Sequence, residues 1–146
     1  MRPEEPWELG KSLDHASVLY DHADGKIKLY YSIATDCGVT CDQKTDEEDG
    51  MLGYAESVDG RHFYKPKLGL INDTNLLGPN VAGPSVFLNR NPNASAEERF
   101  ISVGKCHAAA SMCPSAWAWM TSPDGVHWPN IRHPSTCAMK KSVDTQ

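Results

Sequence analysis

Short runs of apolar and β-branched residues, separated by turn residues, dominate the hydrophobic and polar pattern of the chain. The first run is residues 17–20, and an Asp-Gly dipeptide typical of hairpin turns follows at 24–25. Residues 26–33 then alternate polar and apolar side chains, as a half-buried strand does. Residues 51–56 are predicted as a third strand and residues 62–64 as a fourth. The first half of the chain is therefore expected to be a four-stranded antiparallel unit.

The same order of elements returns in the second half of the chain. Residues 84–88, 99–103 and 116–120 match the first three strands, and a fourth is expected after the next turn. The turns also match, because SVDGRHF at 57–63 returns as SPDGVHW at 122–128. The turn is predicted to be scaffold: its Gly supplies a positive φ, its Asp bonds its own backbone, and its last aromatic packs between units. No segment is predicted to be helical, and a repeated four-stranded unit is typical of β-propeller blades.

The repeat also predicts the domain organisation. The fold class is all-β, with two four-stranded antiparallel sheets of an incomplete five-bladed propeller, and the whole chain is a single partial domain. The first blade covers about residues 12–70 and the second about 80–131. KSLD at 11–14 returns as KSVD at 141–144, so residues 141–146 are predicted to begin a third blade. We expect a fragment whose open edges are covered by the remaining blades or by another chain.

Composition excludes several classes of function. The chain has 146 residues, 23% of them charged, and a net charge of −5. This acidic balance argues against a nucleic-acid partner, which needs clustered Lys and Arg. No apolar run approaches the roughly 20 residues of a membrane span, and the N-terminus has no signal-peptide pattern. Fingerprints of nucleotide cofactors and of serine or zinc hydrolases are missing, so no cofactor is expected.

A family resemblance is carried by five stretches in order, which are WELGKSLDHASVLYD, DGKIKLYYS, YAESVDGRHFYKPKLGLI, GPSVFLNRNPNASAEERF and SPDGVHW. Over about residues 7–128, and again at 142–146, the chain resembles the five-bladed β-propeller glycosidases, which include invertases, levanases, arabinanases and arabinofuranosidases. The resemblance implies a central funnel lined by the innermost strands. It also implies two carboxyl groups flanking the scissile bond, one as acid and one as base or nucleophile.

The resemblance assigns the catalytic carboxylates to Asp14 in the first unit and Asp144 in the third. The second unit has Ala82-Gly83 at that position, and no invertase-type Asn-Asp-Pro triplet occurs, so both departures count against hydrolysis. The expected function is binding of carbohydrate, or glycoside hydrolysis in the full-length parent, and the alternative is a non-catalytic propeller serving as an interaction module. The two strand tryptophans alternate with alanines, so they share one face for sugar stacking or blade packing. The candidate substrate-binding residues are His15, Trp117 and Trp119.

The cysteines suggest two local disulfides. Cys37 and Cys41 lie in the loop between the second and third strands of the first unit, and Cys106 and Cys113 lie in the matching loop of the second. Cys137 is left over. A zinc site and free thiols are the alternatives, although neither pair has the CxxC spacing of structural zinc sites, so no metal is expected.

Two sequons and one acidic run complete the candidate sites. Asn72 and Asn93 begin Asn-x-Ser/Thr triplets in predicted loops, which with paired cysteines favour an extracellular or secretory setting. Residues 42–49 are acidic but lack the ligand spacing of an EF-hand, so they are predicted to form a solvated loop.

Overall fold

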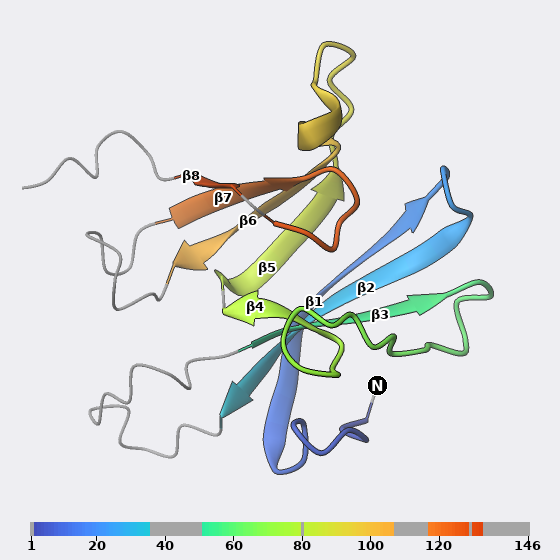
Figure 1. Ribbon diagram of the computed structural model, residues 1–146, viewed down its shortest axis with the longest axis vertical. Helices are drawn as coiled ribbons and strands as arrows, with labels where there is room; N and C mark the ends of the chain where they lie inside the picture. The colour runs from blue at the N-terminus through green and yellow to red at the C-terminus, as the bar shows by residue number, and fades with distance from the viewer. Residues whose placement is uncertain (1, 36–50, 80, 107–116, 129, 133–146) are drawn as a thin grey trace, which may run out of the picture.

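The structure is a computed structural model that describes residues 2–35, 51–79, 81–106, 117–128 and 130–132. In these ranges the chain is all-β, with two four-stranded antiparallel sheets and one 3₁₀ turn (Figure 1). Sheet A has the order β1 (Lys11–Asp21), β2 (Lys26–Thr35), β3 (Met51–Ser57) and β4 (Leu76–Pro79). Sheet B has the order β5 (Val81–Leu88), β6 (Phe100–Cys106), β7 (Trp117–Ser122) and β8 (Asn130–Arg132), with the 3₁₀ turn η1 (Ala96–Glu98) before β6. No helix within the described ranges is long and apolar enough to cross a membrane.

The prediction of two four-stranded antiparallel sheets is confirmed, and the fourth strand of sheet B follows the second turn as expected, but the position of the fourth strand of sheet A was wrong. Tyr64, expected in a strand, forms only an isolated bridge with Glu56. The fourth strand of sheet A is β4, which pairs with the start of β3, and that of sheet B is β8. Pro66 explains this difference, because it has no backbone N–H to continue a ladder beyond Tyr64.

The repeated turn has the same hydrogen bonds in both sheets. Asp59 Oδ1 accepts the backbone N–H of His62 at 2.8 Å, and Asp124 Oδ1 accepts that of His127 at 2.8 Å. A serine two residues earlier accepts the N–H of the turn glycine, at 2.9 Å in the first turn and 2.8 Å in the second. Both glycines have positive φ, 73° at Gly60 and 80° in the second turn. The roles predicted for the Gly and the Asp of this turn are therefore confirmed, whereas of the two aromatics only Trp128 packs between the sheets and Phe63 packs on the other side of sheet A.

The two sheets pack against each other through the side of sheet A that carries Tyr30 and Tyr54. We call this side the front face of sheet A. It packs on Val86 of β5 and on Trp128, which follows the second turn, and the rings of Tyr30 and Trp128 meet edge to face at 6.3 Å. The side of sheet B that carries Val86 is its back face. The first strands of the two sheets, β1 and β5, are in contact, and we call them the inner strands. Val86 N donates to Ser17 Oγ at 3.0 Å.

A buried ion pair closes the junction between the sheets. Asp21, at the end of β1, is 1% exposed and pairs with Arg99, which precedes β6. The Arg99 guanidinium also lies over the ring of Phe100, which is fully buried. Burial works against ionisation of Asp21, but hydrogen bonds from Ala23 N and Arg99 outweigh it and lower the pKa of Asp21.

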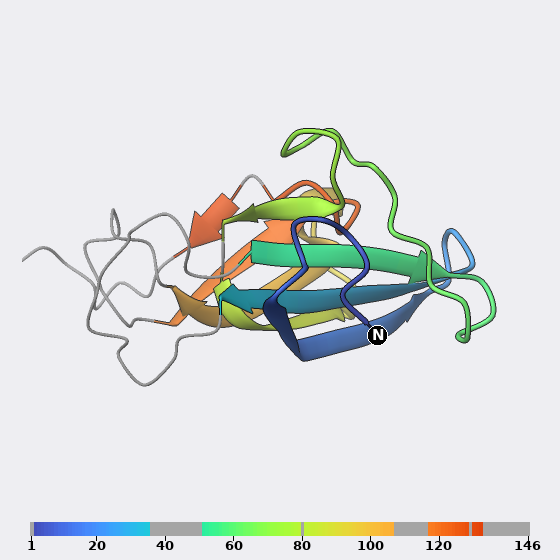
Figure 2. The ribbon, with the colours of Figure 1, turned by 90° about the horizontal axis from the view of Figure 1, so that it is seen from below.

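The opposite side of sheet A, its back face, carries Leu29, Tyr31 and Ile33 and is partly covered by Trp7 and Phe63. Figure 2 shows the N-terminal segment and the segment between β3 and β4 lying along this sheet. A buried network holds the cover in place. Its atoms come from Glu8, Tyr31, Lys65 and Asn75, with Glu8 completely inaccessible to solvent.

Candidate functional site

The inner strands of the two sheets are interrupted at the same place. In β1 the register shifts between Asp14 and Ser17, so His15 and Ala16 stand opposite one residue of β2. In β5 the register shifts between Ala82 and Ser85, again with two residues opposite one. A bulge bends its strand and redirects a side chain, and bulges are over-represented next to active sites. The repeat therefore marks one position on each inner strand.

In β1 this position carries a carboxylate and an imidazole. His15 has a φ of 44°, a left-handed conformation that few non-glycine residues adopt. Its Nδ1 lies 3.1 Å from Asp14 Oδ1, and the two side chains are 68% and 42% exposed. Backbone strain of this kind costs about 1–3 kcal/mol and gathers at functional sites. The pair is therefore presented to solvent at a strained point of the innermost strand.

The two predicted sugar-binding tryptophans lie in a different sheet from this pair. Asp144 lies outside the described residues. Trp117 and Trp119 lie on β7, the third strand of sheet B, whereas β1 contacts sheet B through β5. Trp119 is 36% exposed on the side of sheet B that faces away from sheet A. We call this side the front face of sheet B.

The predicted modification sites are only partly described. Asn72 and Asn93 are both exposed in loops, as the sequons require, and Asn72 has a φ of 50°. Cys106 is the last residue of β6. The other cysteines, which are Cys37, Cys41, Cys113 and Cys137, lie outside the described residues, as does the acidic run 42–49.

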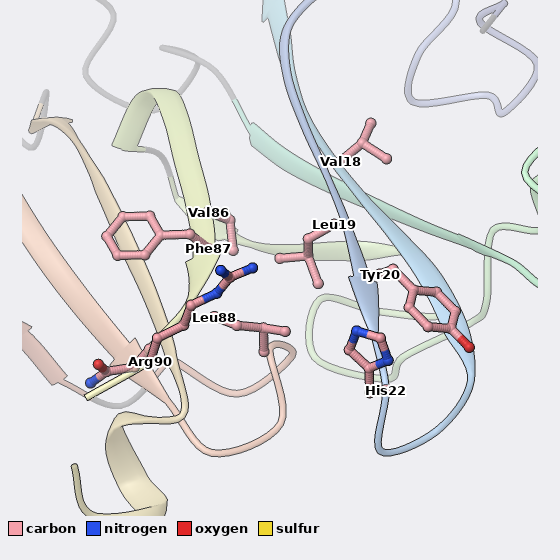
Figure 3. A pocket seen from close by; sticks show the side chains of 9 residues that line it. Val18, Leu19, Tyr20, His22, Val86, Phe87, Leu88 and Arg90 are labelled. Carbon is pink, nitrogen blue, oxygen red and sulfur yellow. The ribbon is translucent and has the colours of Figure 1, made fainter. Parts of the chain in front are cut away.

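The structure also has a groove that was not predicted from the sequence. An open groove of about 690 Å³ lies between the ends of β1 and β5 and continues to Arg90. Figure 3 shows Leu19 pointing from β1 toward β5, with the Arg90 side chain reaching into the space between the strands. At its rim the rings of Tyr20 and His22 meet edge to face at 4.7 Å. The sequence does not single these residues out, and only the contact between β1 and β5, which belong to different sheets, brings them together.

The described residues contain no group of three or more His, Cys, Asp or Glu side chains that could hold a metal ion. The chain matches no known protein family, no curated protein and no solved structure. The arrangement itself therefore carries the functional argument. It offers hydrogen-bonding groups at the bulge of β1 and an apolar, partly aromatic groove at the far end of the same strand.

Proposed function

We propose that the two sheets are blades of a β-propeller and that the chain binds carbohydrate at the bulge of β1. One observation carries this proposal: Asp14 and His15 form an exposed pair at a strained bulge whose counterpart in β5 has neither group. A carboxylate accepts hydrogen bonds from sugar hydroxyls, and an imidazole both donates and accepts. The resemblance to propeller glycosidases supports carbohydrate as the ligand class.

Binding is favoured over hydrolysis by the same comparison of the two strands. Glycoside hydrolysis needs two carboxyl groups roughly 5–10 Å apart. Asp14 supplies one, whereas Ala82 occupies the matching register position on β5. The second candidate function is a non-catalytic interaction module. The presence of Ala82 where β1 has a carboxylate favours this function as well. The two candidates differ in whether Asp14 contacts a sugar.

The loops support an extracellular or secretory setting for this function. Both sequon asparagines, Asn72 and Asn93, are exposed and therefore accessible to a glycosyl transferase. Treatment of the secreted chain with a glycosidase that removes N-linked glycans should lower its mass. An unchanged mass would contradict this part of the proposal.

The sugar site is tested by a titration followed in ¹H–¹⁵N spectra. Sucrose, fructo-oligosaccharides and arabino-oligosaccharides are added to the wild-type chain, to Asp14→Asn and to Asp73→Asn. Asp73 is the matched control, because its side chain is 74% exposed in a loop away from the inner strands. We expect shifts in the residues flanking the bulge for at least one sugar, at least tenfold weaker binding by Asp14→Asn, and unchanged binding by the control.

Two results would contradict the proposal. One is the absence of any shift up to about 50 mM sugar, a concentration about 50-fold above a dissociation constant of about 1 mM, which corresponds to about 4 kcal/mol of binding free energy. The other is equal binding by wild type and Asp14→Asn. An assay with aryl arabinofuranosides and sucrose runs in parallel and is expected to show no turnover. Turnover that disappears in Asp14→Asn would show that the chain holds a complete hydrolytic site.

A further inference from the structure

Both outward faces of the two-sheet unit expose large apolar side chains. On the back face of sheet A, Val18 is 61% exposed and Tyr20 is 48% exposed. On the front face of sheet B, Phe87 is 44% exposed and Trp119 is 36% exposed. Strand register fixes the faces, since Val18 pairs with Leu29 of the back face of sheet A. These surfaces are not the sugar site proposed above.

Because the two sheets are repeats, each exposed residue on these faces has an equivalent residue in the other sheet, and the surroundings of that equivalent can be compared. Ser17 and Ser85 both follow the bulge, so Val18 of β1 corresponds to Val86 of β5. Val86 is 6% exposed because it packs on the front face of sheet A. Counting from the turns, Trp119 corresponds to Tyr54, which is 1% exposed in the same interface. The exposed residues are therefore counterparts of residues that the contact between sheets A and B buries.

Polar contacts in that interface also have counterparts on the open faces. Ser17 Oγ accepts the backbone N–H of Val86 between the inner strands. Ser85 occupies the position of Ser17 in sheet B and is exposed. A neighbouring sheet whose Val18 took the place of Val86 would bring its N–H to Ser85. The open faces thus continue the geometry of the contact already present between sheets A and B.

From this correspondence we infer that the chain associates head to tail with a second copy of itself. The front face of sheet B in one copy contacts the back face of sheet A in the other. Among the described residues, the front face of sheet A is covered by the back face of sheet B, and the β1 part of the back face of sheet A, with Val18 and Tyr20, is still open. The contact is heterologous, because different surfaces of the two copies meet.

The contact between copies is weaker than the contact within one chain, for three reasons. The N-terminal segment covers the β2 and β3 part of the back face, which leaves mainly the inner strand available. In the contact between copies, Asn89 takes the place of Asp21 and Lys26 takes the place of Arg99. The negative partner of the ion pair is therefore missing. Each copy also carries a net charge of −5. We therefore expect reversible association that added salt strengthens by screening this repulsion.

Analytical ultracentrifugation of the whole chain, from about 1 µM to about 1 mM, tests the inference. Val18→Glu blocks the back face of sheet A, and Trp119→Glu blocks the front face of sheet B. Val58→Glu is the matched control, because Val58 is 81% exposed on the turn after β3 and belongs to neither face. Tyr20→Glu and Phe87→Glu replace the two blocking variants if either fails to give the wild-type circular dichroism spectrum.

The expected result is association of the wild type and of Val58→Glu, with at least tenfold weaker association of each blocked variant alone. A mixture of Val18→Glu and Trp119→Glu should form a one-to-one dimer, since each variant retains the face that the other lacks. A monomeric wild type at every concentration would overturn the inference, and so would a blocked variant that still self-associates or a mixture that stays monomeric. No sugar is involved, so this result is independent of the carbohydrate proposal.

Discussion

Two neighbouring tyrosines on β2 should respond in opposite directions to the same substitution. Tyr30 and Tyr31 are both buried, at 0% and 2% exposure, but on opposite faces of sheet A. The Tyr31 hydroxyl donates to Glu8 Oε1 at 2.6 Å and accepts from Asn75 Nδ2 at 2.7 Å. The Tyr30 hydroxyl has no hydrogen-bond partner among the described residues. Substitution by Phe therefore removes a satisfied hydroxyl at one position and an unsatisfied one at the other.

The magnitudes follow from these contacts. A hydrogen bond to a charged group contributes about 1.5–3 kcal/mol, so Tyr31→Phe should lower the free energy of unfolding by about 2 kcal/mol. Glu8 keeps its ion pair with Lys65 at 2.6 Å, which limits the loss. An unsatisfied buried polar group costs about 1–3 kcal/mol, so Tyr30→Phe should raise the free energy of unfolding by about 1 kcal/mol. The difference between the two variants is about 3 kcal/mol.

Urea unfolding of the two variants and of the wild type measures this difference. With an m-value of about 2 kcal/mol/M, the two midpoints should lie about 1.5 M apart. The m-values should agree, because neither substitution changes the surface exposed on unfolding by much. Equal destabilisation by Tyr30→Phe and Tyr31→Phe would refute the assignment of the polar network to Tyr31 alone.

Three further predictions concern the turns and the bulge. Gly125→Ala should lower the free energy of unfolding by about 2–4 kcal/mol and Gly60→Ala by about 1 kcal/mol: both have positive φ, but only a Cβ at Gly125 would overlap the Tyr30 hydroxyl. A double-mutant cycle with Tyr30→Phe should recover part of the Gly125 loss, and additive effects would contradict the clash. His15→Gly should raise the melting temperature by relieving the φ of 44° while weakening sugar binding, so a variant that loses stability would argue against strain at the bulge. Burial disfavours ionisation of Asp124, but hydrogen bonds from His127 outweigh it and lower its pKa to about 2. Its stabilising contribution, about 1 kcal/mol after allowing for solvent screening, is present above pH 4 and is lost as the pH falls toward 2. Asp124→Asn should therefore flatten the pH dependence of unfolding in that window, and an unchanged slope would contradict this.

The local parts of the fold could be predicted from the sequence. The two Asp-Gly turns carry their own hydrogen bonds within four residues, so SVDGRHF and SPDGVHW specify them without help from distant residues. The first three strands of each unit alternate clearly around these turns. The fourth strand of sheet A was misplaced because β4, Leu76–Pro79, is short, contains Gly and Pro, and pairs with β3 only after a long connecting segment.

Contacts between distant residues account for what the sequence did not show. Glu8 looks like an exposed residue of an acidic N-terminus, yet it is buried by Tyr31 and Lys65, which are 23 and 57 positions away. The bulge of β1 was not predicted either, although Asp14 and His15 were singled out by the family resemblance. Its signal lies in aligning DHAS at 14–17 with AGPS at 82–85, because the two segments occupy matching positions within the equivalent strands β1 and β5.

The repeat makes each sheet a control for the other, and this separates scaffold from function. Where both sheets carry the same residue in the same contact, as at Asp59 and Asp124, the contact maintains the turn of the sheet and needs no ligand to explain it. Where the backbone repeats but the side chains differ, packing cannot explain the difference. The bulges of β1 and β5 are such a place, because β1 has Asp14 and His15 at the two positions where β5 has Ala82 and Gly83. A strained, exposed carboxylate and imidazole that the second sheet does without are therefore explained by a ligand at the first bulge better than by the stability of the sheet.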